Sequence, residues 1–284
     1  MSDQKSSKTE KDSHYARLRR QHRDMKAGSP AKQQGRSRPA IEGAPVPPET
    51  VRLYGLHTVR AALDNHQRTI RRMLITKNAL VRLEVADPSA LPFPVEIVEP
   101  RAIDRETGSE AVHQGVMIEA NPLKAQKLHD LKDSTLLLVL DQVTDPHNVG
   151  AIMRSAVAFG AGAIITTSRH SPQETGVLAK SASGALELIP HIEVRNLADA
   201  LGELHALGFM TIGLDSEGPA ELEKTLTGAR IALVLGAEGK GLRQKTRETV
   251  TALARLDMPG AIKSLNVSNA AAISLYAARL HLRC

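Results

Sequence analysis

Polar residues that could carry out chemistry gather in three loops, and the first of these covers residues 141–150. The loop follows an apolar run and carries Asn148, which is placed to cap the helix that we predict over 149–159. Arg154 lies on the polar face of that helix, where a guanidinium group could bind a phosphate or a ribose. By spacing alone, a solvated helix face explains Arg154 better than a ligand contact does.

The same loop contains three possible metal ligands, Asp141, Asp145 and His147. Three oxygen or nitrogen ligands within one short loop are a weak signal for a metal site. Aspartate is also common in turns, because its side chain bonds to the nearby backbone. Turn formation therefore explains these residues better, and we predict that the protein holds no metal.

The second loop, residues 236–241, is rich in glycine and follows the apolar run 231–235. Glycines at such a place let the backbone approach a ligand closely. The loop matches neither the G-x-G-x-x-G pattern of dinucleotide-binding folds nor the phosphate-binding P-loop. A tight turn from strand to helix would explain the glycines without a ligand. Glu238 would then be unexplained, since a turn does not require a carboxylate between its glycines.

The third loop, residues 258–268, offers Ser264, Asn266 and Ser268 just where a long C-terminal helix begins. If the loop has no catalytic role, Ser264 simply caps that helix. The helix is lined with small residues over 269–278, which would allow close packing against a partner helix, for example across a dimer. High helix propensity of alanine is the competing explanation for this composition.

The elements that position these loops are buried strands that alternate with helices. Continuous apolar runs, typical of strands covered on both faces, lie at 136–140, 163–166, 209–214, 231–235 and 252–256. Helical segments lie at 149–159, 197–207 and 242–250. This alternation predicts a parallel sheet with helices on both sides. In such sheets, ligands bind beyond the carboxyl ends of the strands, where the three loops lie.

Composition divides the chain of 284 residues into four parts. Residues 1–48 hold 11 Lys and Arg against 5 Asp and Glu, whereas the remainder holds 26 of each. The whole net charge of +6 thus lies in an arm with too few apolar residues to fold alone, which either contacts RNA phosphates or acts as a solubilising tail. We predict a small α/β domain over 49–123, a polar linker over 124–133 and the parallel-sheet domain over 134–284.

The sequence predicts neither a membrane span nor a secretory signal. The longest apolar run has five residues, at 136–140, whereas a membrane span needs about 20. The first residues are polar and charged, without an apolar segment behind them. Cys284 is the single cysteine, which excludes an intrachain disulfide and fits a reducing compartment. We therefore expect a cytoplasmic protein.

Taken together, the three loops resemble the three motifs of the SpoU (TrmH-type) RNA 2′-O-ribose methyltransferases. The matching segments, which also agree in order and spacing, are 145–150 with Arg154, 235–241 and 264–268. Two upstream segments, 54–59 and 112–116, resemble the subgroup that methylates a guanosine ribose in 23S ribosomal RNA. The resemblance covers about residues 51–281 and leaves the basic arm outside.

The resemblance implies a fold, a cofactor and partners. The C-terminal domain would be an α/β-knot (SPOUT) domain with a deep trefoil knot, preceded by a small L30e-like domain that presents RNA. The family works as homodimers and uses S-adenosylmethionine, held in a bent form. Position by position, this implies a cofactor site formed by Gly236, Leu256, Met258, Leu265 and Asn266. The sequence departs from the family at 256–260, where the proline stands two places later than usual.

The resemblance also assigns catalytic roles. Arg154 would be the essential residue, and we expect it to stabilise the developing alkoxide and to bind the adjacent phosphate. Arginine is a poor base, because its pKa stays above about 12 in proteins. Asn148 and Ser264 would orient Arg154 and the ribose, Glu238 would shape the site by hydrogen bonding, and Asn266 would order the cofactor loop.

Three other functions remain open at this point. Methylation of a transfer RNA ribose would use the same chemistry on a different substrate. A non-catalytic RNA-binding protein could use the fold as a scaffold, although the presence of all five candidate catalytic residues argues against it. A nicotinamide-dependent dehydrogenase is the weakest alternative, since it would need a glycine fingerprint after the first strand.

Overall fold

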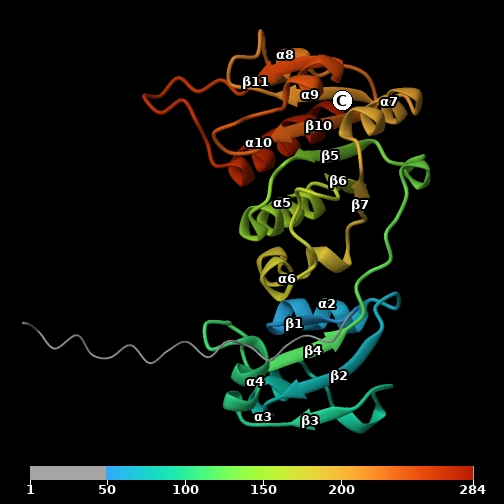
Figure 1. Cartoon of the computed structure of the whole chain (residues 1–284), viewed down its shortest axis with the longest axis vertical. Coiled ribbons are helices and arrows are strands. Elements are labelled where there is room, and N and C mark those ends of the chain that lie inside the picture. The colour runs from blue at the N-terminus through green and yellow to red at the C-terminus, as the bar shows by residue number, and fades with distance from the viewer. Residues whose placement is uncertain (1–48, 284) are drawn as a thin grey trace, which may run out of the picture. The chain divides into compact units, whose positions relative to one another are not determined.

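The computed structural model describes residues 49–283, which form a four-stranded and a seven-stranded sheet with helices packed on them (Figure 1). The basic arm predicted over 1–48 lies outside the described residues. The described residues belong to one compact unit of the chain. None of their helices is long and apolar enough to cross a membrane.

The N-terminal sheet has the order β1-β4-β2-β3. Its strands are β1 (Val51–Tyr54), β2 (Ile70–Ile75), β3 (Val95–Ile97) and β4 (Val116–Ala120). Its helices are α2 (Leu56–Asp64), α3 (Lys77–Arg82) and α4 (Pro100–Thr107). β4 runs antiparallel to both of its neighbours, whereas β3 is parallel to β2. The predicted small α/β pattern is therefore present as a mixed sheet.

The C-terminal sheet is parallel throughout and has the order β7-β6-β5-β10-β8-β11-β9. Its strands are β5 (Leu136–Asp141), β6 (Ala163–Thr167), β7 (His191–Val194), β8 (Met210–Leu214), β9 (Ala220–Glu221), β10 (Ile231–Gly236) and β11 (Ala252–Arg255). Its helices are α5 (Pro146–Ala158), α6 (Gly176–Ala182), α7 (Leu197–Ala206), α8 (Leu222–Thr225), α9 (Gln244–Thr249) and α10 (Val267–His281). The predicted α/β class is confirmed.

Helices cover both faces of β5, an interior strand of this sheet. Leu136, Leu138 and Leu140 belong to one hydrophobic cluster with residues of α5 and α10, whereas Leu137 and Val139 belong to another with residues of α7. Successive side chains of a strand point to opposite faces, so a strand buried on both faces must be apolar at every position. This explains the uninterrupted apolar run at 136–140.

The structure moves one predicted helix start and gives a second helix a different cap from the one considered. α5 begins at Pro146, because Asp145, not Asn148, caps it by accepting a hydrogen bond from the backbone N–H of His147 at 3.0 Å. Proline at the first helical position needs no hydrogen-bond acceptor and favours this earlier start. Asn266, not Ser264, caps α10 and accepts from Ser268 N at 2.8 Å. In both loops the capping residue therefore differs from the one that spacing suggested.

The small residues of α10 do not face outward. Ala271, Ala277 and Ala278 are buried against the chain's own core, whereas Ile273 and Tyr276 are 46% and 53% exposed. Their close packing is within the chain, where α10 contacts α5, and packing of α10 against a helix of a second copy stays a prediction. The trefoil knot, through which the segment before α10 would be threaded, stays a prediction.

Candidate active site

The three predicted loops meet at the carboxyl edge of the parallel sheet. β5 and β10 are direct neighbours, with Gly236 level with Asp141 in the register, so the loops that follow them lie side by side. The third loop joins β11 to α10, and α10 packs against β10 and α5. The fold thus brings together segments that are more than 80 residues apart in the sequence.

Glu238 is the centre of a polar cluster built from all three loops. Its Oε1 atom accepts hydrogen bonds from Asn148 Nδ2 at 3.3 Å, from Asn266 Nδ2 at 2.7 Å and from the backbone N–H of Val267 at 3.2 Å. Asn266 Nδ2 also donates to Asn148 Oδ1 at 3.0 Å. One carboxylate therefore ties the first and third loops to the second. This accounts for the carboxylate between glycines that turn formation alone left unexplained.

Arg154 and Ser264 stand outside this cluster. Arg154 is exposed on α5, and its guanidinium makes no hydrogen bond or ion pair with any residue in the part of the chain that the structure describes. Ser264 is also exposed, and its hydroxyl bonds to no residue within 49–283. The structure therefore joins three of the five predicted catalytic residues and leaves the polar groups of the other two available to a ligand.

A cavity of about 340 Å³ opens beside Glu238. Gly236, Leu256, Met258 and Leu265, which the sequence predicted as cofactor contacts, all line it, and so do Glu238 and Ser264. Asn266, the fifth predicted contact, does not line the cavity but bonds to Glu238, which does. The volume falls within the roughly 300–1,000 Å³ that is usual for small-molecule sites, and the lining is largely apolar with a few polar groups.

The loop 236–241 has no room for a side chain at Gly236. A Cβ atom there would overlap the backbone of Gly241 and Leu242, because the loop folds back on itself through a hydrogen bond of 2.8 Å from Gly241 N to Ala237 O. Gly241 itself has a φ of +64°, a conformation that favours glycine. The glycines therefore make a tight wall for the cavity and leave its backbone groups accessible.

Asp141 fixes the segment that directly follows the same loop. Its fully buried carboxylate accepts hydrogen bonds from Arg243 N at 3.0 Å and from Arg243 Nε at 2.6 Å, just after the glycine-rich loop. His147 contacts Ser181, with Nδ1 3.2 Å from Oγ, and Asp145 caps α5. The three possible metal ligands of the first loop thus have other partners. Within residues 49–283, no group of three such side chains is placed to hold a metal ion.

Sequence reasoning did not predict the segment 214–216 of the cavity wall, and it gave no role to Lys263 of the third loop. Asp215 pairs with Arg247 and accepts from Glu217 N at 2.9 Å, which fixes the end of β8. Lys263 Nζ donates to Met258 O at 2.5 Å and closes the loop that carries the displaced proline. The sequence did contain a signal for residues 214–216. They follow a predicted strand, and β8 ends at the same edge of the sheet as β10.

Two family models match the chain, and between them they cover most of the described residues. The first is described as the SpoU rRNA Methylase family and matches residues 135–276. The second is described as RNA 2′-O ribose methyltransferase substrate binding and matches residues 52–126. Together they account for both sheets of the structure.

Curated relatives and solved structures agree with these models. The 23S rRNA (guanosine-2′-O-)-methyltransferase RlmB of Pseudomonas putida is 37% identical over 236 residues, which are 80% of this chain and 95% of the relative. RlmB of Ralstonia nicotianae is 40% identical over 237 residues, which are 80% and 94% of the two chains.

Two solved structures extend the comparison. The SpoU methyltransferase AviRb from Streptomyces viridochromogenes has the same fold, with a TM-score of 0.70, 21% identity, and coverage of 83% of this chain and 90% of that one. An AdoMet-bound rRNA methyltransferase from Sinorhizobium meliloti is 26% identical with a TM-score of 0.69, covering 82% and 88%. The resemblance inferred from the three motifs is confirmed. The chain belongs to the SpoU rRNA methylase family.

Proposed function

We propose that the protein transfers a methyl group from S-adenosylmethionine to the ribose 2′-hydroxyl of a guanosine in 23S ribosomal RNA. The observation that carries this proposal is the Glu238 cluster beside the cavity, which joins all three motif loops. The chain also spans about 95% of relatives whose name states this reaction, and it contains the matching substrate-binding segment. These relatives favour ribosomal over transfer RNA as the substrate.

The cavity suits S-adenosylmethionine by its lining. Leu256, Met258 and Leu265 offer apolar surface to an adenine ring, and Gly236 presents backbone groups without a side chain in the way. The related Sinorhizobium meliloti enzyme is described as AdoMet-bound. When bound, this cofactor supplies the methyl group and a sulfonium leaving group.

The residues around the cavity would position the RNA and stabilise charge. Arg154, with no partner of its own among the described residues, would pair with the RNA phosphate and stabilise the negative charge that develops on the 2′-oxygen. Asn148 and Ser264 would orient the ribose. Glu238 would hold Asn148 and Asn266 in place through its hydrogen bonds, and Asn266 would order the third loop as the cap of α10.

The direct test is transfer of a labelled methyl group from S-adenosylmethionine to undermodified 23S and transfer RNA, followed by mapping of the 2′-O-methyl position. We expect label on a guanosine ribose of 23S RNA. Label on transfer RNA alone would keep the chemistry and reject the substrate. Absence of cofactor binding, measured by calorimetry, would instead support the RNA-binding scaffold.

The Glu238 cluster makes a first prediction. Glu238→Ala removes the acceptor shared by Asn148, Asn266 and the Val267 amide, so the three loops are no longer held in their relative positions. We expect kcat to fall by about 10²-fold, because small misplacements of positioning residues cost that much. Glu238→Gln keeps one acceptor oxygen and should retain more activity. Glu248→Ala, which removes an exposed carboxylate from nearby α9, is the matched control and should leave kcat unchanged.

We further propose that two copies of the chain pair through α10. Ile273, Tyr276 and Leu280 are each 45–53% exposed and lie three and four residues apart, so they form one apolar stripe on this helix. The Tyr276 ring also packs on Phe159 of the neighbouring α5, with ring centroids 5.9 Å apart. The stripe therefore lies next to the helix that carries Arg154. The homodimers of the family are the reason to assign a second copy as its partner.

The proposed dimer gives a second prediction. Tyr276→Glu places a charge in the apolar stripe, and we expect the dimer dissociation constant to rise by about 30-fold or more, as for aromatic residues at interface centres. Sedimentation velocity over a concentration series measures this constant. Ala206→Glu, at an exposed position of α7 on the opposite face of the sheet, should leave it unchanged. A wild-type chain that is monomeric at micromolar concentration would reject the dimer.

A further inference from the structure

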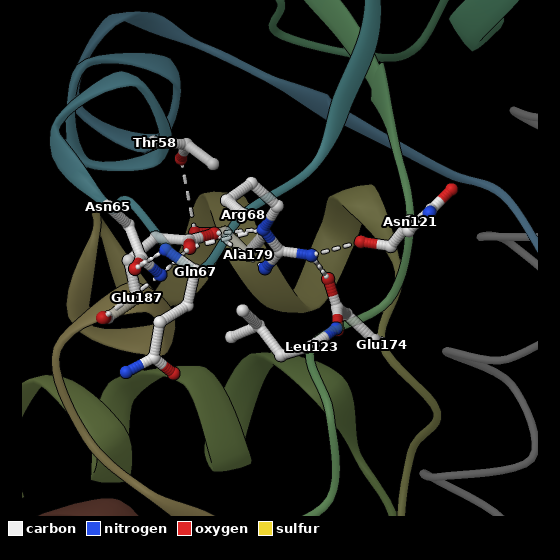
Figure 2. Close-up of polar contacts among 9 residues, drawn as sticks. All are labelled: Thr58, Asn65, Gln67, Arg68, Asn121, Leu123, Glu174, Ala179 and Glu187. Carbon is white, nitrogen blue, oxygen red and sulfur yellow. Dashed lines mark hydrogen bonds and ion pairs between the residues drawn. The ribbon is translucent and has the colours of Figure 1, made fainter.

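Arg68 is a charged residue with no exposed side-chain surface. It lies between α2 and β2 of the N-terminal sheet, and its side chain is 0% exposed. Its guanidinium donates from Nη2 to Glu187 Oε1 at 2.6 Å, from Nε to both Glu187 oxygens at 3.1 Å, and from Nη1 to Glu174 Oε1 at 2.6 Å and Asn121 O at 2.7 Å (Figure 2). Burial of a charge is costly unless it is paired in this way.

The carboxylates that hold Arg68 belong to the other sheet's segment of the chain. Glu174 precedes α6, and Glu187 ends the short helix that follows α6. Glu187 also accepts from Asn65 Nδ2 at 2.7 Å, and Glu174 also accepts from the backbone N–H of Leu123, just before the linker, at 3.0 Å. Two carboxylates of the methyltransferase segment therefore hold the substrate-binding segment at its α2–β2 loop and at Leu123 (Figure 2).

Further contacts between the two segments involve α6. Thr58 Oγ1 donates to Ala179 O at 3.1 Å in a buried position, and Lys180 Nζ donates to Gln114 Oε1 at 2.5 Å. Gly176 has no space for a Cβ atom, because Tyr54 and the backbone of Arg52 lie against it. Such contacts depend on direction and close fit, unlike a purely apolar surface. They favour a single docked arrangement.

α6 is also the wall against which the catalytic helix α5 packs. A Cβ atom at Gly150 would overlap Ser181 and the backbone of α6, and Ser181 Oγ lies 3.2 Å from His147 Nδ1 in the first motif. Asn148 and Arg154 project from α5. The position of the substrate-binding segment is therefore set, through one short helix, relative to the residues proposed to act on the ribose.

We infer that Arg68 is a positioning residue for the RNA. Its ion pairs with Glu174 and Glu187 fix the substrate-binding segment beside α6. One RNA molecule can then contact both segments and reach the cavity beside Glu238. This inference rests on the proposed function. Its physical basis is effective concentration. When the two segments are fixed relative to each other, an RNA molecule bound to one segment loses less entropy on binding to the other. The residue acts through Glu174 and Glu187 and touches no reacting atom.

The test compares Arg68→Met with Arg71→Met in the full-length protein. Both changes remove one positive charge from neighbouring positions, but Arg71 is exposed, and among the described residues its side chain bonds only to Asn121 Oδ1. For Arg68→Met we expect the KM for 23S RNA to rise by about 10-fold or more. Linkage of two binding surfaces can raise affinity by more than this, so the expected rise is a modest share of that gain. The affinity for S-adenosylmethionine, measured by calorimetry, should change by less than about twofold, because the cavity lies on other loops. Arg71→Met should change neither value beyond that range.

Limited trypsin digestion reports the docking itself. Lys124 and Lys127 are exposed in the linker next to the Glu174 contact, so cleavage there should be faster in Arg68→Met than in Arg71→Met. Arg68→Met combined with Glu187→Met removes both charges. It should be cleaved more slowly than the single variant, because the fully buried Glu187 charge is gone and the remaining carboxylate, Glu174, is 15% exposed and keeps its bond from Leu123 N. Should Arg68→Met fail to fold, Arg68→Lys and Glu174→Gln weaken the same contacts more gently and are measured in its place.

The outcomes separate this inference from the proposed function. Faster cleavage with an unchanged KM for RNA would make Arg68 a structural residue and overturn the positioning role. If the wild type binds S-adenosylmethionine but methylates no RNA, the proposed function fails. The affinity of the same variants for 23S RNA in filter binding then decides the role of Arg68: equal affinities reject it, and weaker binding by Arg68→Met alone supports it.

Discussion

Replacing Arg154 with alanine will lower kcat for methyl transfer to RNA by about 10²–10³-fold, the usual cost of removing a group that stabilises a developing oxyanion. The guanidinium is exposed on α5 and pairs with no residue within 49–283, so its removal leaves no buried group unsatisfied and should not disturb the fold. Calorimetric affinity for S-adenosylmethionine should stay at the wild-type value, because Arg154 does not line the cavity. Single-turnover rates with saturating RNA measure the effect on chemistry.

Arg154→Lys separates the effect of the positive charge from that of the planar guanidinium. Lysine keeps the positive charge but not the planar fork of donors, so we expect a rate between those of wild type and alanine, about 10-fold below wild type. Lys245→Ala removes an exposed charge from α9 and is the control for net charge. Near-normal turnover of Arg154→Ala would exclude this residue from the mechanism.

Gly236→Ala is expected to weaken the binding of S-adenosylmethionine by about 100-fold. The added Cβ atom would overlap the backbone of Gly241 and Leu242. The loop cannot easily yield, because Asp141 anchors it through two hydrogen bonds to Arg243. Overpacking costs roughly 1–3 kcal/mol, and contact with backbone rather than with a flexible side chain puts this site at the upper end. Isothermal titration calorimetry gives the dissociation constant directly.

Gly202→Ala serves as the control for this substitution. Gly202 lies in α7, and no atom stands within 4 Å of a Cβ atom added there, so alanine should be neutral or slightly stabilising. Thermal unfolding of Gly236→Ala separates a local change in the loop from general instability. An unchanged affinity for the cofactor in a folded Gly236→Ala protein would show that this loop is not part of the cofactor site.

The hydrophobic pattern was sufficient to predict the parallel sheet, but it did not identify the short elements β7 and α6. The runs at 136–140 and 231–235 became β5 and β10, since strands buried on both faces must be apolar throughout. β7, with the sequence His191–Val194, was missed because it is short and mixes polar with apolar residues. α6 was missed as well, since its seven residues are too few for a clear helical period. Element limits were less accurate still, as the caps Asp145 and Asn266 illustrate.

The candidate site was predictable because its motifs are local. Each of the segments 145–150, 236–241 and 264–268 follows or precedes a regular element, and residue types within a few positions of one another carry the signal. The role of Glu238 as the acceptor shared by Asn148 and Asn266 was not predictable in detail. Hydrogen bonds across 28 and 90 residues depend on which strands are neighbours in the sheet, and spacing along the chain does not contain that order.

By itself, the sequence determined the fold class, the motif family and four of the residues that line the cavity, because apolar period and motif spacing are properties of the chain. Only the tertiary structure decided which polar groups become partners. Arg68 is one of 37 lysines and arginines, and nothing in its local sequence sets it apart. Glu174 and Glu187, which bury it, are each more than 100 residues away in the sequence. The packing of the folded chain therefore determines which buried charges become partners.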